Sequence, residues 1–240
     1  MKPIVILRFS AEDGPGYFAS FLDAQRVPWT LFAIDEGNDP PSSLDDFSGL
    51  VLMGGPMSAN DALPWIPKVL ALIREARARD TPVLGHCLGG QLMSKALGGT
   101  VTLNAVKEIG WQPALAETHD AARDWLGPLA GQSMRVFQWH GETFSIPPGA
   151  TRILTGEACA NQAFVIGASL GMQCHIEMTP DMVQDWCGDW NTEGVGISSS
   201  VEAPGQIAIG IGTHLKTMRV VADQLYAKWL DGAKRQRDNQ

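Results

Sequence analysis

The sequence predicts an α/β fold in which a mostly parallel central sheet is flanked by helices. Three observations support this fold class. Short apolar runs alternate with longer segments of helical periodicity up to Gly99. These apolar runs are nearly continuous, as in strands that are buried on both faces. The chain of 240 residues, 45% of them hydrophobic, is also long enough to enclose a substantial core.

The elements of the first half follow the order that such a sheet requires. Residues 65–79 predict a helix, because Ile66, Val69 and Ile73 share one face and charged residues follow on the other. Residues 82–85 predict a buried strand that ends at a glycine. The full set expected here comprises strands at 3–7, 29–34, 49–53 and 82–85, and helices at 16–25, 65–79 and 89–97.

After Gly99 the pattern changes to short strands separated by Gly and Pro, which is typical of hairpins. These strands are expected at 101–103, 111–115, 135–139, 152–154, 163–166 and 169–174, with helices at 180–190 and about 213–230. No internal repeat, low-complexity tract or linker interrupts the sequence. We therefore expect a single domain over residues 1–240, with its core at about 3–190.

Charge and cysteine usage exclude several classes of function. The net charge of −8 disfavours nucleic acid or an anionic membrane as the main partner. The cysteines are Cys87, Cys159, Cys174 and Cys187; they form no CxxC pair, so neither a zinc site nor a disulfide framework is indicated. The chain shows no secretory leader and no apolar run of membrane-spanning length. We expect a cytoplasmic location, where a free catalytic thiol stays reduced.

The most informative segment is Gly85-His86-Cys87-Leu88-Gly89, between a predicted strand and a predicted helix. Gly-x-Cys-x-Gly in this position is the cysteine form of the nucleophile elbow, whose sharp turn requires small neighbours. The turn places the sulfur at a helix N-terminus, where the positive end of the helix dipole favours a thiolate. A thiolate is a nucleophile, so the segment indicates an enzyme with a covalent intermediate.

A cysteine nucleophile needs a nearby base and a group that orients this base. Two units of the type His-x-Glu could supply both, His140 with Glu142 and His175 with Glu177. Residues two apart in an extended segment point to the same side, so each unit can aim its carboxylate at its own imidazole. The residues alone do not decide between the two units.

Five segments resemble those of the class I (triad) glutamine amidotransferase family, especially free-standing members similar to the amidotransferase domain of GMP synthetase. They occur in the order of that family and are numbered 52–58 (Leu-Met-Gly-Gly-Pro-Met-Ser), 83–91 (Val-Leu-Gly-His-Cys-Leu-Gly-Gly-Gln), 107–111 (Lys-Glu-Ile-Gly-Trp), 139–144 (Trp-His-Gly-Glu-Thr-Phe) and 170–177 (Leu-Gly-Met-Gln-Cys-His-Ile-Glu). Five ordered segments are far more specific than one elbow motif. The resemblance implies the flavodoxin-like fold of this family.

The resemblance also implies a role for each matching residue. Cys87 would be the nucleophile, His175 the general base and acid, and Glu177 the residue that orients His175. Backbone N–H groups of Gly55 and Leu88 would form the oxyanion hole. The side chain of Gln91 and the segment Trp139, His140 and Gly141 would line the pocket for the substrate. No cofactor and no metal ion are expected.

The chain departs from the family pattern at a few positions. Many relatives have an aromatic residue and a proline where this chain has Cys174 and Ile176, and both side chains should point away from His175 and Glu177. His86 and Gly90 are unusual neighbours of the elbow, and we expect His86 to be a packed residue. The remaining histidines and cysteines are expected to have no catalytic role, with His119 in a solvated loop, His214 without a functional signal, and Cys159, Cys174 and Cys187 in the core.

Three interpretations of the function follow. The protein hydrolyses the side-chain amide of L-glutamine as an amidotransferase subunit and passes ammonia to a synthase partner. Alternatively, it is a free-standing hydrolase of γ-glutamyl peptides or other γ-glutamyl compounds. A third possibility is a regulatory or binding protein that keeps the fold without turnover. The intact set of Cys87, His175 and Glu177 argues against the third possibility.

Overall fold

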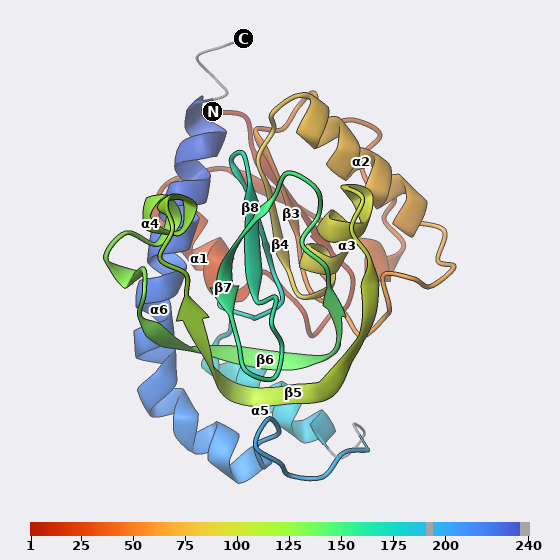
Figure 1. The fold of residues 1–240 in the computed structure, drawn as a ribbon. Coiled ribbons are helices and arrows are strands. Elements are labelled where there is room, and N and C mark those ends of the chain that lie inside the picture. Colours follow the sequence, from red (N-terminus) through yellow and green to blue (C-terminus); the bar gives the residue numbers. More distant parts are fainter. Residues whose placement is uncertain (191–193, 236–240) are drawn as a thin grey trace.

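The computed structural model describes residues 1–190 and 194–235. Within these residues, the strands form one nine-stranded sheet in the order β2-β1-β3-β4-β9-β8-β7-β5-β6 (Figure 1). In this order, each neighbouring pair from β2 to β9 is parallel. Each neighbouring pair from β9 to β6 is antiparallel. The bounds are β1 Ile4–Arg8, β2 Trp29–Ala33, β3 Gly49–Leu52, β4 Val83–His86, β5 Val101–Ala116, β6 Ser133–Phe144, β7 Thr151–Thr155, β8 Ala163–Ile166 and β9 Ser169–Met172.

Helices cover both faces of the parallel part of the sheet, as the sequence predicts. Side chains of β1 alternate between two cores. Ile4 and Ile6 share a core with α1 and α6, whereas Val5 and Leu7 share a core with α2 and α3. The helix bounds are α1 Gly16–Ala24, α2 Ile66–Ala78, α3 Leu88–Ala96, α4 Asp120–Leu126, α5 Pro180–Asp189 and α6 Pro204–Arg235, with short 3₁₀ helices at Ile34–Glu36 and Gly127–Leu129. Figure 1 shows α2 and α3 on one side of the strands and α6 on the other.

The second half departs from the expected elements in strand β5, in the start of helix α6 and in helix α4, which was not expected. The segments 101–103 and 111–115 are not separate strands but belong to the 16-residue strand β5, which pairs with β6 across an irregularity between Leu103 and Glu108. Polar residues at this irregularity break the apolar pattern, although the backbone pairing resumes beyond it. The C-terminal helix also begins earlier than expected, at Pro204.

His119 is exposed and lies in the non-helical segment directly before α4, as expected, and it also caps this helix. The imidazole Nδ1 of His119 accepts a hydrogen bond from the N–H of Ala122 at 3.3 Å, which caps α4. Its Nε2 lies 2.8 Å from the carbonyl oxygen of Arg152. The sequence analysis did not predict the helix α4 that follows, because histidine is an uncommon capping residue.

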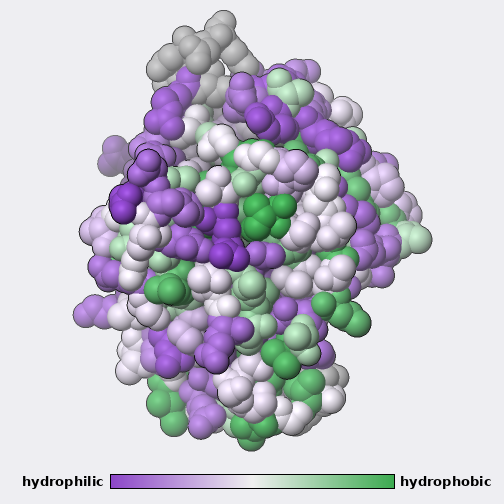
Figure 2. Space-filling view, viewed as in Figure 1, coloured by the Kyte–Doolittle hydropathy of each residue, from purple (hydrophilic) through white to green (hydrophobic). Residues whose placement is uncertain are grey.

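On the face shown in Figure 2, hydrophobic residues form small separate groups between hydrophilic ones. Such scattering is normal for a globular surface and does not define a docking surface by itself. Among the described residues, no helix combines the length and the apolar character that a membrane crossing requires.

Candidate active site

A cavity of about 500 Å³ lies where the parallel strands end. Its walls include the segments that follow β1, β3, β4 and β9, the usual position of ligand sites in open α/β sheets, together with parts of β5, β6 and α5. The residues that line it are Ser10, Glu12, Asp13, Gly55, Pro56, Met57, Ser58, Cys87, Gln91, Leu103, Lys107, Trp139, His140, Gly141, Glu142, His175, Trp186 and Asp189. The sequence-predicted candidates Cys87 and His175 thus face one cavity.

Cys87 occupies a strained turn between β4 and α3. Its φ of +46° and ψ of −106° are rare for a residue with a side chain. The neighbours must be small, because a Cβ on Gly85 would lie 2.5 Å from the carbonyl carbon of Gly89, and one on Gly89 would lie 2.2 Å from the carbonyl oxygen of Leu52. Gly90 has the same constraint, since its Cβ would lie 2.3 Å from the oxygen of Met172. The turn has the geometry of a nucleophile elbow.

His175 and Glu177 form a buried pair beside this turn. The Nδ1 atom of His175 lies 2.6 Å from Oε1 of Glu177, and both residues are 1% exposed. Reciprocal backbone hydrogen bonds between His175 and Phe137 hold the segment extended, so that His175 and Glu177 share a side. The ring of Trp186 packs edge-on against the imidazole, with 4.9 Å between the ring centres.

The electrostatics of this pair suit a general base. Burial by itself would lower the pKa of His175, but the Glu177 carboxylate and the Cys87 thiol raise it well above the ordinary value. Burial would also raise the pKa of Glu177, but His86 and His175 lower it to about 2. The Nε2 atom of His175 is buried and has no hydrogen-bond partner among the described residues. It is therefore available for a proton from the cavity side.

Gln173 is a site residue that the sequence interpretation did not single out. Its Nε2 donates toward Sγ of Cys87 at 3.4 Å, and its Oε1 accepts a hydrogen bond of 3.3 Å from Nε2 of Gln91. The signal was present in the sequence, because Gln173 precedes His175 by two residues and therefore points to the same side of an extended segment. The side-chain amides of Gln91 and Gln173 thus form a chain of hydrogen bonds that ends at the sulfur of Cys87.

The second His-x-Glu unit has a different geometry from the one expected. Nε2 of His140 lies 2.9 Å from Oε2 of Glu108, and Nδ1 lies 2.9 Å from the backbone oxygen of Glu142. The carboxylate of Glu142 instead accepts a hydrogen bond from the hydroxyl of Ser58 at 3.0 Å. The arrangement that the sequence allowed, with the Glu142 carboxylate on His140, is not formed, because Glu108 and His140 are directly paired residues of β5 and β6.

Potential metal-ligand atoms of Glu108, His140 and Cys159 lie within 4.8 Å of one another. Each of them has a protein partner. Glu108 also accepts a hydrogen bond of 2.8 Å from Nε2 of Gln162, and the Cys159 sulfur lies 3.1 Å from the hydroxyl of Thr143. We interpret the cluster as a hydrogen-bond network that holds His140 in the cavity wall.

The remaining predicted residues are placed as follows. Gly55, Gln91, Trp139 and Gly141 line the cavity. Leu88 opens α3 directly after Cys87 and lies beside Gly55, since a Cβ on that glycine would be 3.0 Å from the Leu88 side chain. The backbone roles expected for Gly55 and Leu88 stay predictions.

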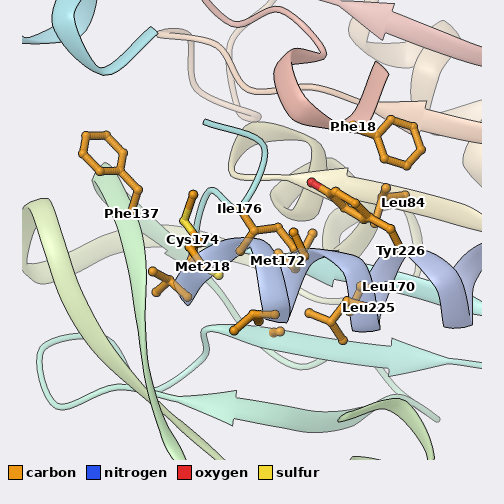
Figure 3. Close-up of a cluster of buried hydrophobic side chains, with 14 of the residues drawn as sticks. Phe18, Leu84, Phe137, Leu170, Met172, Cys174, Ile176, Met218, Leu225 and Tyr226 are labelled. Atoms are coloured by element: carbon orange, nitrogen blue, oxygen red, sulfur yellow. The ribbon is translucent and has the colours of Figure 1, made fainter. Parts of the chain in front are cut away.

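Cys174 and Ile176 alternate with the site residues and point into the core, as predicted. Both are 0% exposed and lie in a cluster with Met172, Met218 and Leu225 (Figure 3). Burial also raises the pKa of the Cys174 thiol, which therefore stays protonated. The two residues that depart from the family pattern thus lie in the core, on the side of the segment opposite to His175 and Glu177.

An α/β sheet with a cysteine elbow and a buried His–Glu pair at one cavity is an arrangement typical of proteins with a cysteine nucleophile. The family pattern named "Glutamine amidotransferase class-I" matches residues 21–185. The chain therefore belongs to the class I glutamine amidotransferase family.

The crystal structure of a glutamine amidotransferase from Methylobacillus flagellatus has 44% sequence identity to this chain and a TM-score of 0.92, with 97% of this chain and 95% of that chain covered. Glutamine amidotransferase-like protein YfeJ of Salmonella typhimurium is 32% identical over 62% of this chain and 64% of its own length. Gamma-glutamyl peptidase 3 of Arabidopsis thaliana is 27% identical over 63% of this chain and 64% of its own. A GMP synthase of Paraburkholderia phytofirmans is 29% identical over 58% of this chain and only 27% of its own length.

Proposed function

We propose that this protein hydrolyses the side-chain amide of glutamine or of a γ-glutamyl compound through a thioester on Cys87. The observation that carries the proposal is the elbow of Cys87 in one cavity with His175, whose imidazole is held by Glu177 at 2.6 Å. Membership of the class I glutamine amidotransferase family supports the same reaction class.

The first half-reaction forms the thioester. His175 accepts the thiol proton of Cys87 on Nε2, and the sulfur attacks the carbonyl carbon of the side-chain amide. The negative charge on the carbonyl oxygen is stabilised by the N–H groups of Gly55 and Leu88. His175 then gives its proton to the leaving nitrogen as the C–N bond breaks, which releases ammonia or an amine.

The second half-reaction uses water in place of the thiol. His175 takes a proton from water, the resulting hydroxide attacks the thioester, and the C–S bond breaks to give a γ-carboxylate and the thiol of Cys87. Glu177 stays ionised and stabilises the imidazolium in both halves. The walls made by Gln91, Trp139, His140 and Gly141 bind the glutamyl part of the substrate.

The nature of the leaving group separates two versions of this activity. A subunit that supplies ammonia to a synthase releases ammonia from L-glutamine, whereas a γ-glutamyl peptide hydrolase releases an amino acid or a peptide. The cavity wall extends beyond the elbow to Leu103, Trp186 and Asp189, which favours room for a leaving group larger than ammonia. The γ-glutamyl peptidase among the relatives is in line with this version.

We place the activity in the cytoplasm, since all four cysteines are free thiols.

Glutamate release by the purified protein tests the proposal. L-glutamine and a panel of γ-glutamyl peptides serve as substrates, and Cys87→Ala is the control. We expect release that depends on Cys87, and stronger release from the peptides identifies a free-standing hydrolase. Weak release from glutamine alone identifies a subunit that needs its synthase. No Cys87-dependent release from any substrate would contradict the proposal and favour a binding protein.

A further inference from the structure

A second buried histidine, His86, faces the carboxylate of Glu177. It is the last residue of β4 and is 0% exposed. Its Nε2 lies 3.6 Å from Oε2 of Glu177 and 3.0 Å from the hydroxyl oxygen of Tyr226 in α6. The reaction described above gives His86 no role, and burial of a polar ring at this position needs an explanation.

The carboxylate of Glu177 is held at one oxygen only. Oε1 is bound by Nδ1 of His175, but Oε2 is buried and has no hydrogen-bond partner among the described residues. An ionised oxygen without a donor is costly in a buried site. A polar N–H that points toward Oε2 from Nε2 of His86 would offset part of this cost and restrict rotation of the carboxylate.

The tautomer of His86 determines whether Nε2 carries this N–H. Nδ1 of His86 is buried and, in the described part of the chain, has no partner. A proton on Nδ1 would leave a buried donor unsatisfied and would turn the lone pair of Nε2 toward the negative carboxylate. A proton on Nε2 places the N–H between Tyr226 and Glu177 and turns the positive end of this N–H toward the carboxylate. The negative carboxylate favours an N–H over a lone pair on the nitrogen that faces it, so the second tautomer is favoured.

We propose that His86 is a positioning residue of the catalytic pair, and that its Nε2–H, held by Tyr226, fixes Oε2 of Glu177 and thereby the orientation of His175. This assignment rests on the function proposed above. The imidazole is held in place by aromatic packing, because Phe18 contacts both His86 and Tyr226 with centre distances of 6.4 and 4.8 Å. Figure 3 shows Phe18 beside Tyr226 at one end of the hydrophobic cluster.

A neutral His86 suits this task better than a charged one. Burial lowers the pKa of His86, and His175 acts in the same direction, against the opposite effect of Glu177. A neutral ring orients the carboxylate by its dipole and leaves the negative charge of Glu177 to stabilise His175.

Coupling between His86 and Glu177 is the property to measure. We would determine kcat and KM of the full chain for His86→Leu and His86→Gln, each in the wild-type background and with Glu177→Gln. In the wild-type background, His86→Leu should lower kcat about 10- to 100-fold, because the carboxylate of Glu177 loses the polar group that faces its Oε2, with little change in KM. The amide of His86→Gln can replace the donor and should recover part of this loss. With Glu177→Gln present, the effect of His86→Leu should shrink to about threefold or less, because the partner is already changed.

Equal losses in the two backgrounds, or a change confined to KM, would overturn the proposal. Tyr226→Phe tests the same coupling by removing only the hydroxyl group that contacts His86. This variant keeps the shape of the side chain, so it can be used even if His86→Leu does not fold. It should lower kcat in the wild-type background and have little effect beside Glu177→Gln. Tyr17→Phe is the matched control, because Tyr17 is the only other tyrosine and its hydroxyl binds Asp223 on the surface.

The alkylation rate of Cys87 by iodoacetamide separates this proposal from the proposed function, because it needs no turnover. The rate measured across pH should have a different profile in His86→Leu than in the wild type and Tyr17→Phe. An unchanged profile would contradict the role of His86, whatever the protein hydrolyses. A changed profile without any glutamate release would support the role of His86 and contradict the proposed function.

Discussion

The amide nitrogen of Gln173 lies 3.4 Å from the sulfur of Cys87 and points its N–H at the nucleophile. The same side chain accepts a hydrogen bond from Gln91, which fixes its orientation. Gln173, His175 and Glu177 occupy alternate positions of one extended segment, so a single strand end supplies a hydrogen-bond donor to the sulfur, an imidazole and the carboxylate that binds this imidazole.

Replacement of Gln173 by Leu should slow the reaction of Cys87 with iodoacetamide at neutral pH about tenfold, because the thiolate loses a hydrogen-bond donor. Mass spectrometry of the alkylated peptides measures the rate at each cysteine. Cys174→Ala is the control, since this thiol is fully buried and should not react in the folded protein. A rate at Cys87 that is unchanged in Gln173→Leu would show that the amide does not act on the sulfur.

Glu177 and Glu142 should differ sharply in their effect on turnover. Glu177→Gln should lower kcat about 10³-fold, because the imidazole loses the carboxylate that sets its tautomer and stabilises its charge. Glu142→Gln should lower it far less, since the Glu142 carboxylate binds Ser58 and does not contact His140. Steady-state kinetics of both variants measure the two decreases in kcat. Decreases of similar size would contradict the assignment of Glu177 as the residue that orients His175.

Gly90 tests the packing that supports the elbow. Gly90→Ala should lower the free energy of unfolding by about 1–3 kcal/mol, because the new methyl group collides with the backbone oxygen of Met172. Gly188→Ala in α5 is the matched control, since no atom lies within 4 Å of its added Cβ. Chemical denaturation measures both. A Gly90→Ala protein as stable as Gly188→Ala would mean that the elbow is less tightly packed than described.

The carboxyl of Asp13 should make stability depend on pH. Burial raises its pKa to about 6, against the effect of His175, from an ordinary value of 3.8 in the unfolded chain. The folded state therefore keeps a proton that the unfolded state loses, and stability declines as the pH rises from 3.8 to 6. Asp13→Asn removes this decline and should raise the free energy of unfolding by about 1–2 kcal/mol at pH 8, with no gain at pH 3.5. Thermal unfolding at both pH values measures the difference, and an equal gain at each would refute the titration.

Local patterns in the sequence were sufficient for the fold class and the elbow, whereas the choice of His175 and Glu177 over His140 and Glu142 came from the resemblance to the family. Small residues around Cys87 and a spacing of two residues are properties of a short segment and can be read directly. The partner of His140 could not be predicted in this way, because Glu108 reaches it through the register of two long strands. Tyr226 reaches His86 from the other end of the chain, and α4 begins at a histidine cap, so both depend on tertiary contacts.

The proposed function depends on a glutamyl thioester on Cys87, and acid-quenched mass spectrometry of the protein during turnover detects this intermediate. We expect a glutamyl adduct on the peptide that contains Cys87, at a level that rises with substrate and vanishes in Cys87→Ala. Glutamate release that persists in Cys87→Ala, or turnover with an adduct on another residue, would show that the reaction does not proceed through a thioester on Cys87.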